Sequence, residues 1–354
     1  MSSGPNDTVL DVHAHYFPSD LPNWAERTGD PRWPSLVLDQ ERTDPPTGRI
    51  MLGDTPFRAV RAPLWDLDAR IAVLDAHSVT LQVVSPTPIM LTYWAEPKPA
   101  LDFARAVNDS LAAHVAASRG RLAGLGTVPL QDPVLAEREL RRLVTELGLA
   151  GVEIGTRAAD RELDDPELAS FFSAAAELDT SLFVHPLDGG DNAIRRGGQP
   201  YDFGLGMLTD TAMAATALVC GGVLDRHPGL RIGLAHGCGT FAWAAPRLKL
   251  GTRLGERPEQ YDTFDETISR LWVDTLVFDP EHLRLLVRRF GAEHVMTGTD
   301  FPFIPGQLEG ARRFVDSAVE IGALDRRQAD AILADNVRTF LGAPAVLSAN
   351  SGNR

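Results

Sequence analysis

The chain has 354 residues, of which 44% are hydrophobic and 23% charged, a composition typical of a globular protein with one large domain or two smaller ones. The formal net charge of -14 argues against a nucleic-acid partner, because phosphate contacts need a clustered excess of Lys and Arg. We find no apolar run that predicts a membrane span, so we expect no membrane partner.

The first predicted element is a buried strand over residues 9–17 that contains the motif His13-Ala14-His15. Successive side chains of a strand point to opposite faces, so His13 and His15 share one face. Neutral imidazole is a common ligand of transition metals, and two imidazoles leave a metal site incomplete. This motif therefore predicts a metal site that needs further ligands, although two histidines could also end a strand and bond only to the backbone.

The next stretch, residues 16–63, is rich in Pro, Asp, Arg and Gly and shows no sustained periodicity. Residues 48–53 and 57–60 predict a small hairpin within it. A connection of this length inside a compact domain is typically functional or disordered. We interpret residues 16–63 as an inserted lid.

From residue 64 onward, helical and strand patterns alternate along the chain. Helices are predicted over 64–74, 102–119, 133–147, 166–178, 210–225, 241–250 and 280–290, and strands over 80–85, 122–128, 151–154, 181–184, 230–235, 271–276 and 294–297. With the opening strand this gives eight strands, which predicts an α/β fold of the TIM-like (β/α)8 barrel type. Two extra helices, 308–321 and 325–340, follow. We predict one domain over residues 1–344 and a polar tail over 345–354.

Polar residues follow the carboxyl ends of several predicted strands, which is where barrel enzymes place their active sites. His13 and His15 end the first strand, and the other candidates are His185, His236 and Asp300. Each residue alone could have a structural role, but five at one mouth favour an active site. We predict that His13, His15, His185 and Asp300 bind one divalent metal ion. Zinc is favoured, with iron, manganese and cobalt left open. We predict that His236 is the acid–base group.

These motifs, together with His185-Pro186, His236-Gly237 and the run Gly298-Thr299-Asp300-Phe301-Pro302, resemble the amidohydrolase superfamily, in the branch that contains metal-dependent decarboxylases. The resemblance covers nearly the whole chain and implies the same four ligands and the same catalytic histidine. It also implies that Arg58 and Arg247 bind substrate carboxylates, with Arg247 contributed by the neighbouring subunit of a homodimer. From position alone, each arginine would be an exposed surface residue.

The resemblance implies a metal-dependent, non-oxidative decarboxylase that acts on a small unsaturated carboxylate metabolite. One alternative is a hydrolase or hydratase that acts on a lactone, an amide or a conjugated acid, because one barrel mouth supports many reactions. Another is a non-catalytic metal-binding scaffold. Release of carbon dioxide distinguishes the first possibility from the others.

The sequence departs from the pattern of this branch beside the expected pocket. Leu187 stands where an aromatic residue is usual, the loop 188–203 is rich in Gly, and Cys238 replaces a glycine. Cys238 is either a small buried hydrophobe or a residue that approaches the substrate. Asp11 and Asp188 are candidates to orient the ligand histidines. With Cys220 and Cys238 as the only cysteines and no signal-peptide pattern, we expect a cytoplasmic protein.

Overall fold

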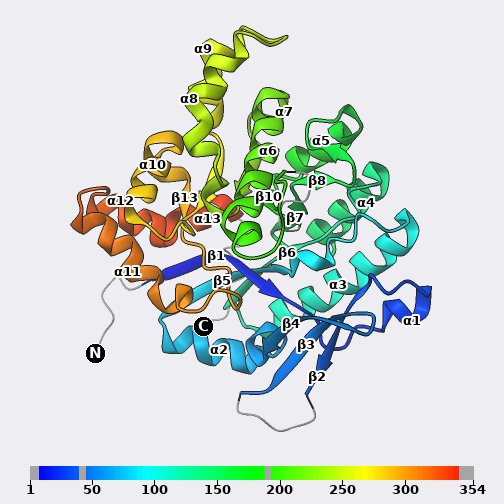
Figure 1. Ribbon diagram of the computed structural model, residues 1–354. Coiled ribbons are helices and arrows are strands. Elements are labelled where there is room, and N and C mark those ends of the chain that lie inside the picture. Colours follow the sequence, from blue (N-terminus) through cyan, green and yellow to red (C-terminus); the bar gives the residue numbers. More distant parts are fainter. Residues whose placement is uncertain (1–7, 40–44, 188–192, 343–354) are drawn as a thin grey trace.

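The computed structural model describes residues 8–39, 45–187 and 193–342. Its centre is an eight-stranded parallel barrel in the strand order β1-β5-β6-β7-β10-β11-β12-β13 (Figure 1). The strands are β1 (Val9–Tyr16), β5 (Val79–Pro86), β6 (Leu122–Gly126), β7 (Gly151–Gly155), β10 (Ser181–His185), β11 (Arg231–Leu234), β12 (Trp272–Asp274) and β13 (Val295–Met296). Backbone hydrogen bonds from Val12 to Thr297 (2.8 Å) and from His15 to Phe301 (2.7 Å) bring the last strand region back to the first. The predicted barrel is confirmed.

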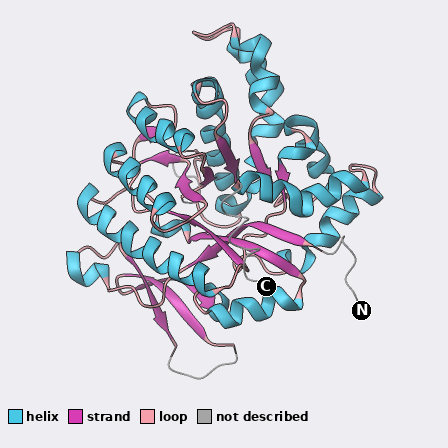
Figure 2. Ribbon diagram, turned by 180° about the vertical axis from the view of Figure 1, so that it is seen from behind, coloured by secondary structure: helices cyan, strands magenta, loops and turns pink. Residues whose placement is uncertain are grey.

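Helices surround the barrel, as the views from the front and from behind show (Figures 1 and 2). Strands covered by helices bury both faces, which explains why β5 and β10 are buried almost throughout. The α-helices of the layer are α2 (Leu67–Ala76), α3 (Pro97–Ala117), α4 (Pro133–Thr145), α5 (Ala169–Glu177), α6 (Met207–Cys220), α7 (Val223–Arg226), α8 (Phe241–Thr252), α9 (Gln260–Ile268) and α10 (Pro280–Phe290). Helix α9 was absent from the predicted elements.

Short helical turns join several of these elements: η1 (Ala62–Leu64), η2 (Pro88–Met90), η3 (Pro166–Leu168), η4 (Asp202–Gly206), η5 (His236–Cys238) and η6 (Ala292–His294). Together η4 and α6 form the segment Asp202–Cys220, which is long and apolar enough to cross a membrane by length and composition alone. The sequence expectation that no apolar run is long enough for a membrane span was therefore wrong for this segment. Ala214, Ala215 and Leu218 of this segment are buried in the apolar core of the protein, and the core helix of a globular protein meets the same criterion.

The segment after β1 forms a small antiparallel sheet of β2 (Pro34–Leu38), β3 (Thr47–Leu52) and β4 (Thr55–Arg61), preceded by α1 (Trp24–Thr28). The predicted hairpin corresponds to β3 and β4, and β2 adds a third strand. Trp24, Trp33 and Ile50 pack into one apolar cluster with Phe103 of α3. Residues 40–44 of this segment lie outside the described residues. The described residues of the segment pack against α3, and its action as a lid stays a prediction.

The two predicted C-terminal helices are α11 (Gln307–Glu320) and a helical run made of α12 (Arg326–Asp330), η7 (Ala331–Asp335) and α13 (Asn336–Leu341). Asp325 caps this run in a capping box with Gln328, as its sequence position indicates. The apolar stripe that includes Ile332, Val337 and Phe340 is buried. The predicted tail, residues 345–354, lies outside the described residues, and the single domain over 1–344 stays a prediction.

Candidate metal centre and active site

The three inward positions of β1 are Asp11, His13 and His15, which alternate with core residues because of the strand's two-residue period. All three side chains are fully buried. His185 ends β10, and Asp300 follows β13, so the barrel brings both to the mouth where β1 ends. The fold thus explains why residues far apart in sequence can meet.

The structure brings His13, His15, His185 and Asp300 together. Each offers one ligand atom, and the four atoms lie within 4.8 Å of one another. The imidazole rings are 5.0–5.2 Å apart between centroids. Oδ1 of Asp300 lies 3.0 Å from Nε2 of His15 and 3.8 Å from Nε2 of His13. This is the set of residues that the sequence predicts as ligands.

The donor set fits a divalent cation. The Nε2 atoms of His13, His15 and His185 are buried and have no hydrogen-bond partner of ordinary geometry among the described residues. Buried polar atoms in folded proteins normally have partners, so three converging imidazole nitrogens beside a carboxylate need an explanation. A cation bound by all four groups explains this arrangement, because three nitrogen ligands and one oxygen ligand suit a transition metal.

Two of the imidazoles are held by their other ring nitrogen. Nδ1 of His13 lies 2.7 Å from Oδ2 of Asp274, and Nδ1 of His185 lies 2.8 Å from the carbonyl oxygen of Pro186. Both partners are acceptors only, so Nδ1 keeps its proton in each ring, and Nε2 of the neutral ring directs its lone pair into the cluster.

The charges of the cluster are set by burial and by neighbouring groups. Burial lowers the pKa of His15 and lowers that of His185 well below its ordinary value, which keeps both rings neutral. Burial alone would lower the pKa of His13 too, but the hydrogen bond and charge of Asp274 raise it to about 9. Without a metal ion His13 is therefore protonated near neutral pH, and its Nε2 proton must leave when a metal ion binds. For Asp300, the proximity of His15 and the other histidines outweighs burial and lowers the pKa to about 2. Asp300 is therefore a carboxylate.

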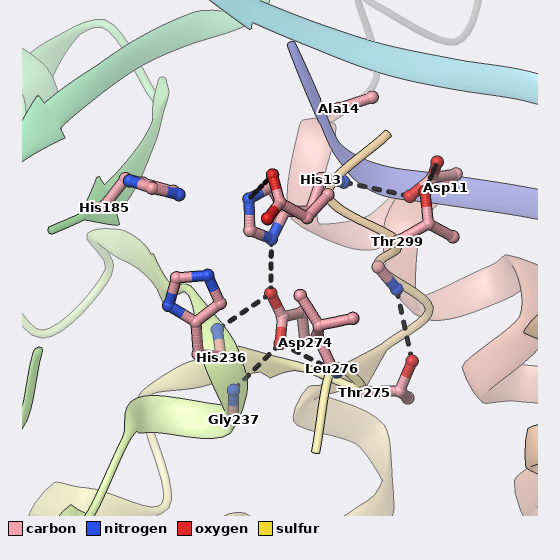
Figure 3. Close-up of polar contacts among 12 residues, drawn as sticks. Asp11, His13, Ala14, His185, His236, Gly237, Asp274, Thr275, Leu276 and Thr299 are labelled. Carbon is pink, nitrogen blue, oxygen red and sulfur yellow. Dashed lines mark hydrogen bonds and ion pairs between the residues drawn. The ribbon is translucent and has the colours of Figure 1, made fainter. Parts of the chain in front are cut away.

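His236 faces the same cluster from the end of β11. Figure 3 shows its ring beside those of His13 and His185, and the centroid distances to these rings are 5.4 and 5.1 Å. Burial, followed by the charge of His13, lowers the pKa of His236 to about 4. His236 is thus a neutral base near neutral pH, as general base catalysis requires.

The backbone around His236 is unusual. His236 and Cys238 have positive φ angles of 56° and 67°, a region that non-glycine residues seldom occupy and that is enriched at functional sites. Gly239 follows with φ 57°, and a Cβ atom there would lie 2.0 Å from the carbonyl oxygen of Leu208. The turn therefore requires glycine at 239. Asp274 holds the same turn by accepting hydrogen bonds from the backbone amides of His236 (3.0 Å) and Gly237 (2.8 Å).

A cavity of about 790 Å³ opens beside His236, between α6, α8 and α10. Most of its walls are apolar, with contributions from Met207, Leu276 and Phe278. A cavity of this size accommodates a small organic molecule. Among the candidate ligands and the candidate catalytic histidine, His236 is the residue that lines it.

A family model for amidohydrolases matches residues 10–343, nearly the whole chain. This chain belongs to the amidohydrolase family. The resemblance stated from the sequence motifs is confirmed. The amidohydrolase is 35% identical to 2-amino-3-carboxymuconate-6-semialdehyde decarboxylase of Dictyostelium discoideum over 88% of each chain.

Two solved structures share the fold of this amidohydrolase. The 5-carboxyvanillate decarboxylase of Sphingomonas paucimobilis aligns with a TM-score of 0.76 at 24% identity, over 94% of this chain and 98% of the other. The 5-carboxyvanillate decarboxylase of Novosphingobium aromaticivorans, solved as a mutant with bound manganese, aligns with a TM-score of 0.74 at 20% identity, over 96% and 99%. At these identities the likeness shows the fold.

The two predicted arginines of the amidohydrolase have different surroundings. Arg58 on β4 reaches the cluster: its guanidinium lies 4.2 Å from the ring centre of Phe303, whose ring is 5.4 Å from that of His15. Burial lowers the pKa of Arg58, and the charge of Asp300 opposes that shift. Arg247 lies on an exposed face of α8 and is not among the residues that line the described cavity. Both arginines are exposed and neither lines the cavity, but within one chain Arg58 lies near the cluster through Phe303.

Sequence reasoning missed two buried carboxyl groups of the amidohydrolase, Asp274 and Glu153. Each is the acidic residue of a short, otherwise apolar strand, Asp274 in β12 and Glu153 in β7. That pattern is the sequence feature that could have identified them. Asp11 contacts His13 through the backbone amide and not through the ring: Oδ1 accepts from the His13 amide at 3.2 Å, while Oδ2 accepts from Gln82 and Thr299. Its predicted role in orienting a ligand imidazole stays a prediction. Asp188 lies outside the described residues. Cys238 is fully buried in the apolar core, in agreement with its reading as a small hydrophobe.

Proposed function

We propose that this amidohydrolase is a metal-dependent, non-oxidative decarboxylase of a small unsaturated carboxylate, most like 2-amino-3-carboxymuconate-6-semialdehyde. The observation that carries the proposal is the convergence of His13, His15, His185 and Asp300 beside the neutral base His236. The relative from Dictyostelium discoideum supports the substrate class, because it is 35% identical over 88% of this chain and its name specifies that reaction.

His13, His15, His185 and Asp300 would hold one divalent ion. When bound, such an ion would supply Lewis-acid activation of water. Zinc is the ion we favour, because three imidazoles and a carboxylate form a borderline N/O set that zinc binds well. Manganese is the main competitor, since the related fold from Novosphingobium aromaticivorans was solved with that metal.

The remaining steps belong to side chains of the chain. His236 would accept a proton from water at the reacting centre and return it to the substrate, which its lowered pKa and its place beside the cluster allow. Arg58 would bind a substrate carboxylate, because its planar guanidinium matches a carboxylate and lies beside Asp300 and Phe303. The apolar cavity beside His236 would hold the carbon skeleton and exclude bulk water.

We also propose that the protein is a homodimer in which Arg247 reaches the neighbouring active site. On α8, Arg247 lies one helical turn from Trp243, which is 83% exposed, and one turn from Leu250, which is 57% exposed. Leu254, just beyond the helix, is 88% exposed. An exposed stripe of large apolar residues that includes an arginine fits an interface between copies of the chain.

We also propose a cytoplasmic location, which the two free cysteines support because disulfides are rare in that compartment.

The test is a carbon dioxide release assay on metal-loaded protein with freshly generated 2-amino-3-carboxymuconate-6-semialdehyde, with His236→Ala as the matched control. We expect release from the wild-type protein only. If the metal-replete wild type releases no carbon dioxide from this compound or from aromatic carboxylates such as 5-carboxyvanillate, the decarboxylase proposal is wrong. Hydrolysis of a lactone or hydration of a conjugated acid would then be the activity to measure.

A further inference from the structure

Glu153 is a charged residue in the middle of β7, the fourth strand of the barrel, with apolar neighbours on either side in sequence. Its side chain is fully buried. Oε2 accepts a hydrogen bond from Oγ of Ser85 at 2.5 Å, whereas Oε1 is buried and has no partner among the described residues. A half-satisfied buried carboxyl group is costly, so a purely structural role leaves its presence unexplained.

His15 lies near Glu153 and needs a hydrogen-bond acceptor for Nδ1. Nδ1 of His13 and Nδ1 of His185 each have an acceptor, but Nδ1 of His15 is buried without a hydrogen-bond partner in the described structure. Oε2 of Glu153 lies 4.0 Å from this nitrogen. The carbonyl oxygen of Pro86 also favours the protonated form of His15 and so raises its pKa against the effect of burial, although it forms no hydrogen bond of ordinary geometry with the ring.

We propose that Glu153 is a positioning residue for His15: its carboxyl oxygen accepts a hydrogen bond from Nδ1–H of His15 and fixes the ring with Nε2 free for the metal ion. The inference rests on the metal site of the proposed function. A small side-chain adjustment or one bridging water closes the 4.0 Å gap. Ser85 sets the starting position, because its Oγ lies 2.5 Å from Oε2 of Glu153 and 3.3 Å from the carbonyl oxygen of Ala14.

With this assignment the three imidazoles of the cluster are oriented in the same manner. His13 uses Asp274, His185 uses the carbonyl of Pro186, and His15 uses Glu153. An acceptor on the outer nitrogen selects the tautomer that can bind a metal and makes the ligand nitrogen more basic. Removing it should therefore weaken metal binding before it changes the fold.

The test is a metal titration that needs no substrate. Metal-free protein competes with a coloured chelator for Zn²⁺, and Co²⁺ spectra report the geometry of the site. The variants are Glu153→Gln, Ser85→Ala and, as the matched control, Glu139→Gln, which alters another fully buried glutamate that is held by Arg105, Asn108 and Arg142 on the outside of the barrel. Unfolding by urea shows whether each variant folds.

We expect Glu153→Gln to lower Zn²⁺ affinity roughly 10- to 100-fold and to change the Co²⁺ spectrum, as found for residues that orient metal ligands. Ser85→Ala should lower the affinity less, and Glu139→Gln should leave both readouts unchanged even if it lowers stability. Unchanged affinity in Glu153→Gln would overturn the inference and assign the orientation of His15 to the Pro86 carbonyl. If wild-type protein binds metal and Glu153→Gln weakens that binding, the inference holds even when no carbon dioxide is released, and only the proposed reaction fails.

Discussion

Oδ2 of Asp274 lies 2.7 Å from Nδ1 of His13, although the two residues are 261 positions apart in the sequence. The same carboxylate accepts hydrogen bonds from the backbone amides of His236 and Gly237. Asp274 therefore links a candidate metal ligand to the turn that presents the candidate catalytic base (Figure 3). Hydrogen bonds to Asp274 and the charge of His13 outweigh burial and lower its pKa, so it remains charged.

The first prediction concerns Asp274→Asn. The neutral amide cannot accept from His13 and from both backbone amides at once, so one buried donor loses its partner. We expect metal affinity to fall about 10- to 100-fold and stability to fall by about 1–3 kcal/mol. A chelator competition and a urea unfolding curve measure the two effects. Wild-type affinity in this variant would contradict the proposed role of Asp274.

The second prediction separates His236 from the metal cluster. We expect His236→Ala to lower kcat by about 10²- to 10⁴-fold, the contribution of a general acid–base group, while metal content stays at the wild-type level. Elemental analysis of the purified variant and a carbon dioxide assay provide the two values. His185→Ala is the matched comparison, because its loss should reduce both. Loss of metal from His236→Ala would mean that His236 is a ligand.

The third prediction concerns Arg58, whose guanidinium stacks on Phe303 near the cluster. Arg58→Lys keeps the charge but loses the planar fork that binds a carboxylate with two parallel hydrogen bonds. We expect KM to rise about tenfold or more, equivalent to about 1.4 kcal/mol of binding, with unchanged metal content. Arg61→Lys on the same strand should behave like the wild type. Steady-state kinetics measure KM, and elemental analysis measures the metal content. A fall in metal content in Arg58→Lys would contradict the proposal that Arg58 binds substrate and takes no part in metal binding.

The barrel could be predicted from sequence because each of its strands is a short apolar run between helical patterns. The candidate ligands could be predicted for a related reason: in a parallel barrel all carboxyl ends lie at one mouth, so His185 and Asp300 can be placed beside His13 without knowing any distance. Helix α9 was missed because its apolar positions are few and follow a run of turn-like residues near Gly255 and Pro258.

The orienting groups could not be found in this way. Whether Asp274 faces His13 or Glu153 faces His15 depends on which side of each strand points inward and on the register between strands. Neither property is fixed by a three- or five-residue apolar run such as β12 or β7. The position of Arg247 was also beyond local reasoning, because a helical pattern does not show whether its exposed face meets solvent or another chain.

The fourth prediction tests the shared active site. If Arg247 acts in the neighbouring subunit, Arg247→Ala and His236→Ala are each inactive, but a heterodimer of the two contains one site with both residues intact. Random pairing makes half the dimers mixed, so co-expression should restore about a quarter of wild-type activity. Activity of the co-expressed pair and the molecular mass in solution are the measurements. No recovery, or a fully active Arg247→Ala monomer, would contradict the shared site.

The last prediction concerns acid stability and His114 of α3, whose ring packs against that of Tyr16 with 4.4 Å between the centroids. Burial, followed by the charge of Arg70 and against that of Asp66, lowers the pKa of His114 from 6.5 to about 4, and its buried Nε2 has no hydrogen-bond partner among the described residues. Above pH 6.5 the ring is neutral in both states, so His114 adds no pH dependence there. Between about pH 6.5 and 4 the unfolded chain binds a proton that the folded chain does not, so stability falls as the pH falls.

We expect the free energy of unfolding of metal-free His114→Phe, which keeps an aromatic ring against Tyr16, to fall by about 1–2 kcal/mol less than that of the wild type between pH 7.5 and 5. Urea unfolding at the two pH values measures this difference, with exposed His77→Phe as the control, and equal losses in wild type and His114→Phe would show that His114 does not titrate as its surroundings indicate.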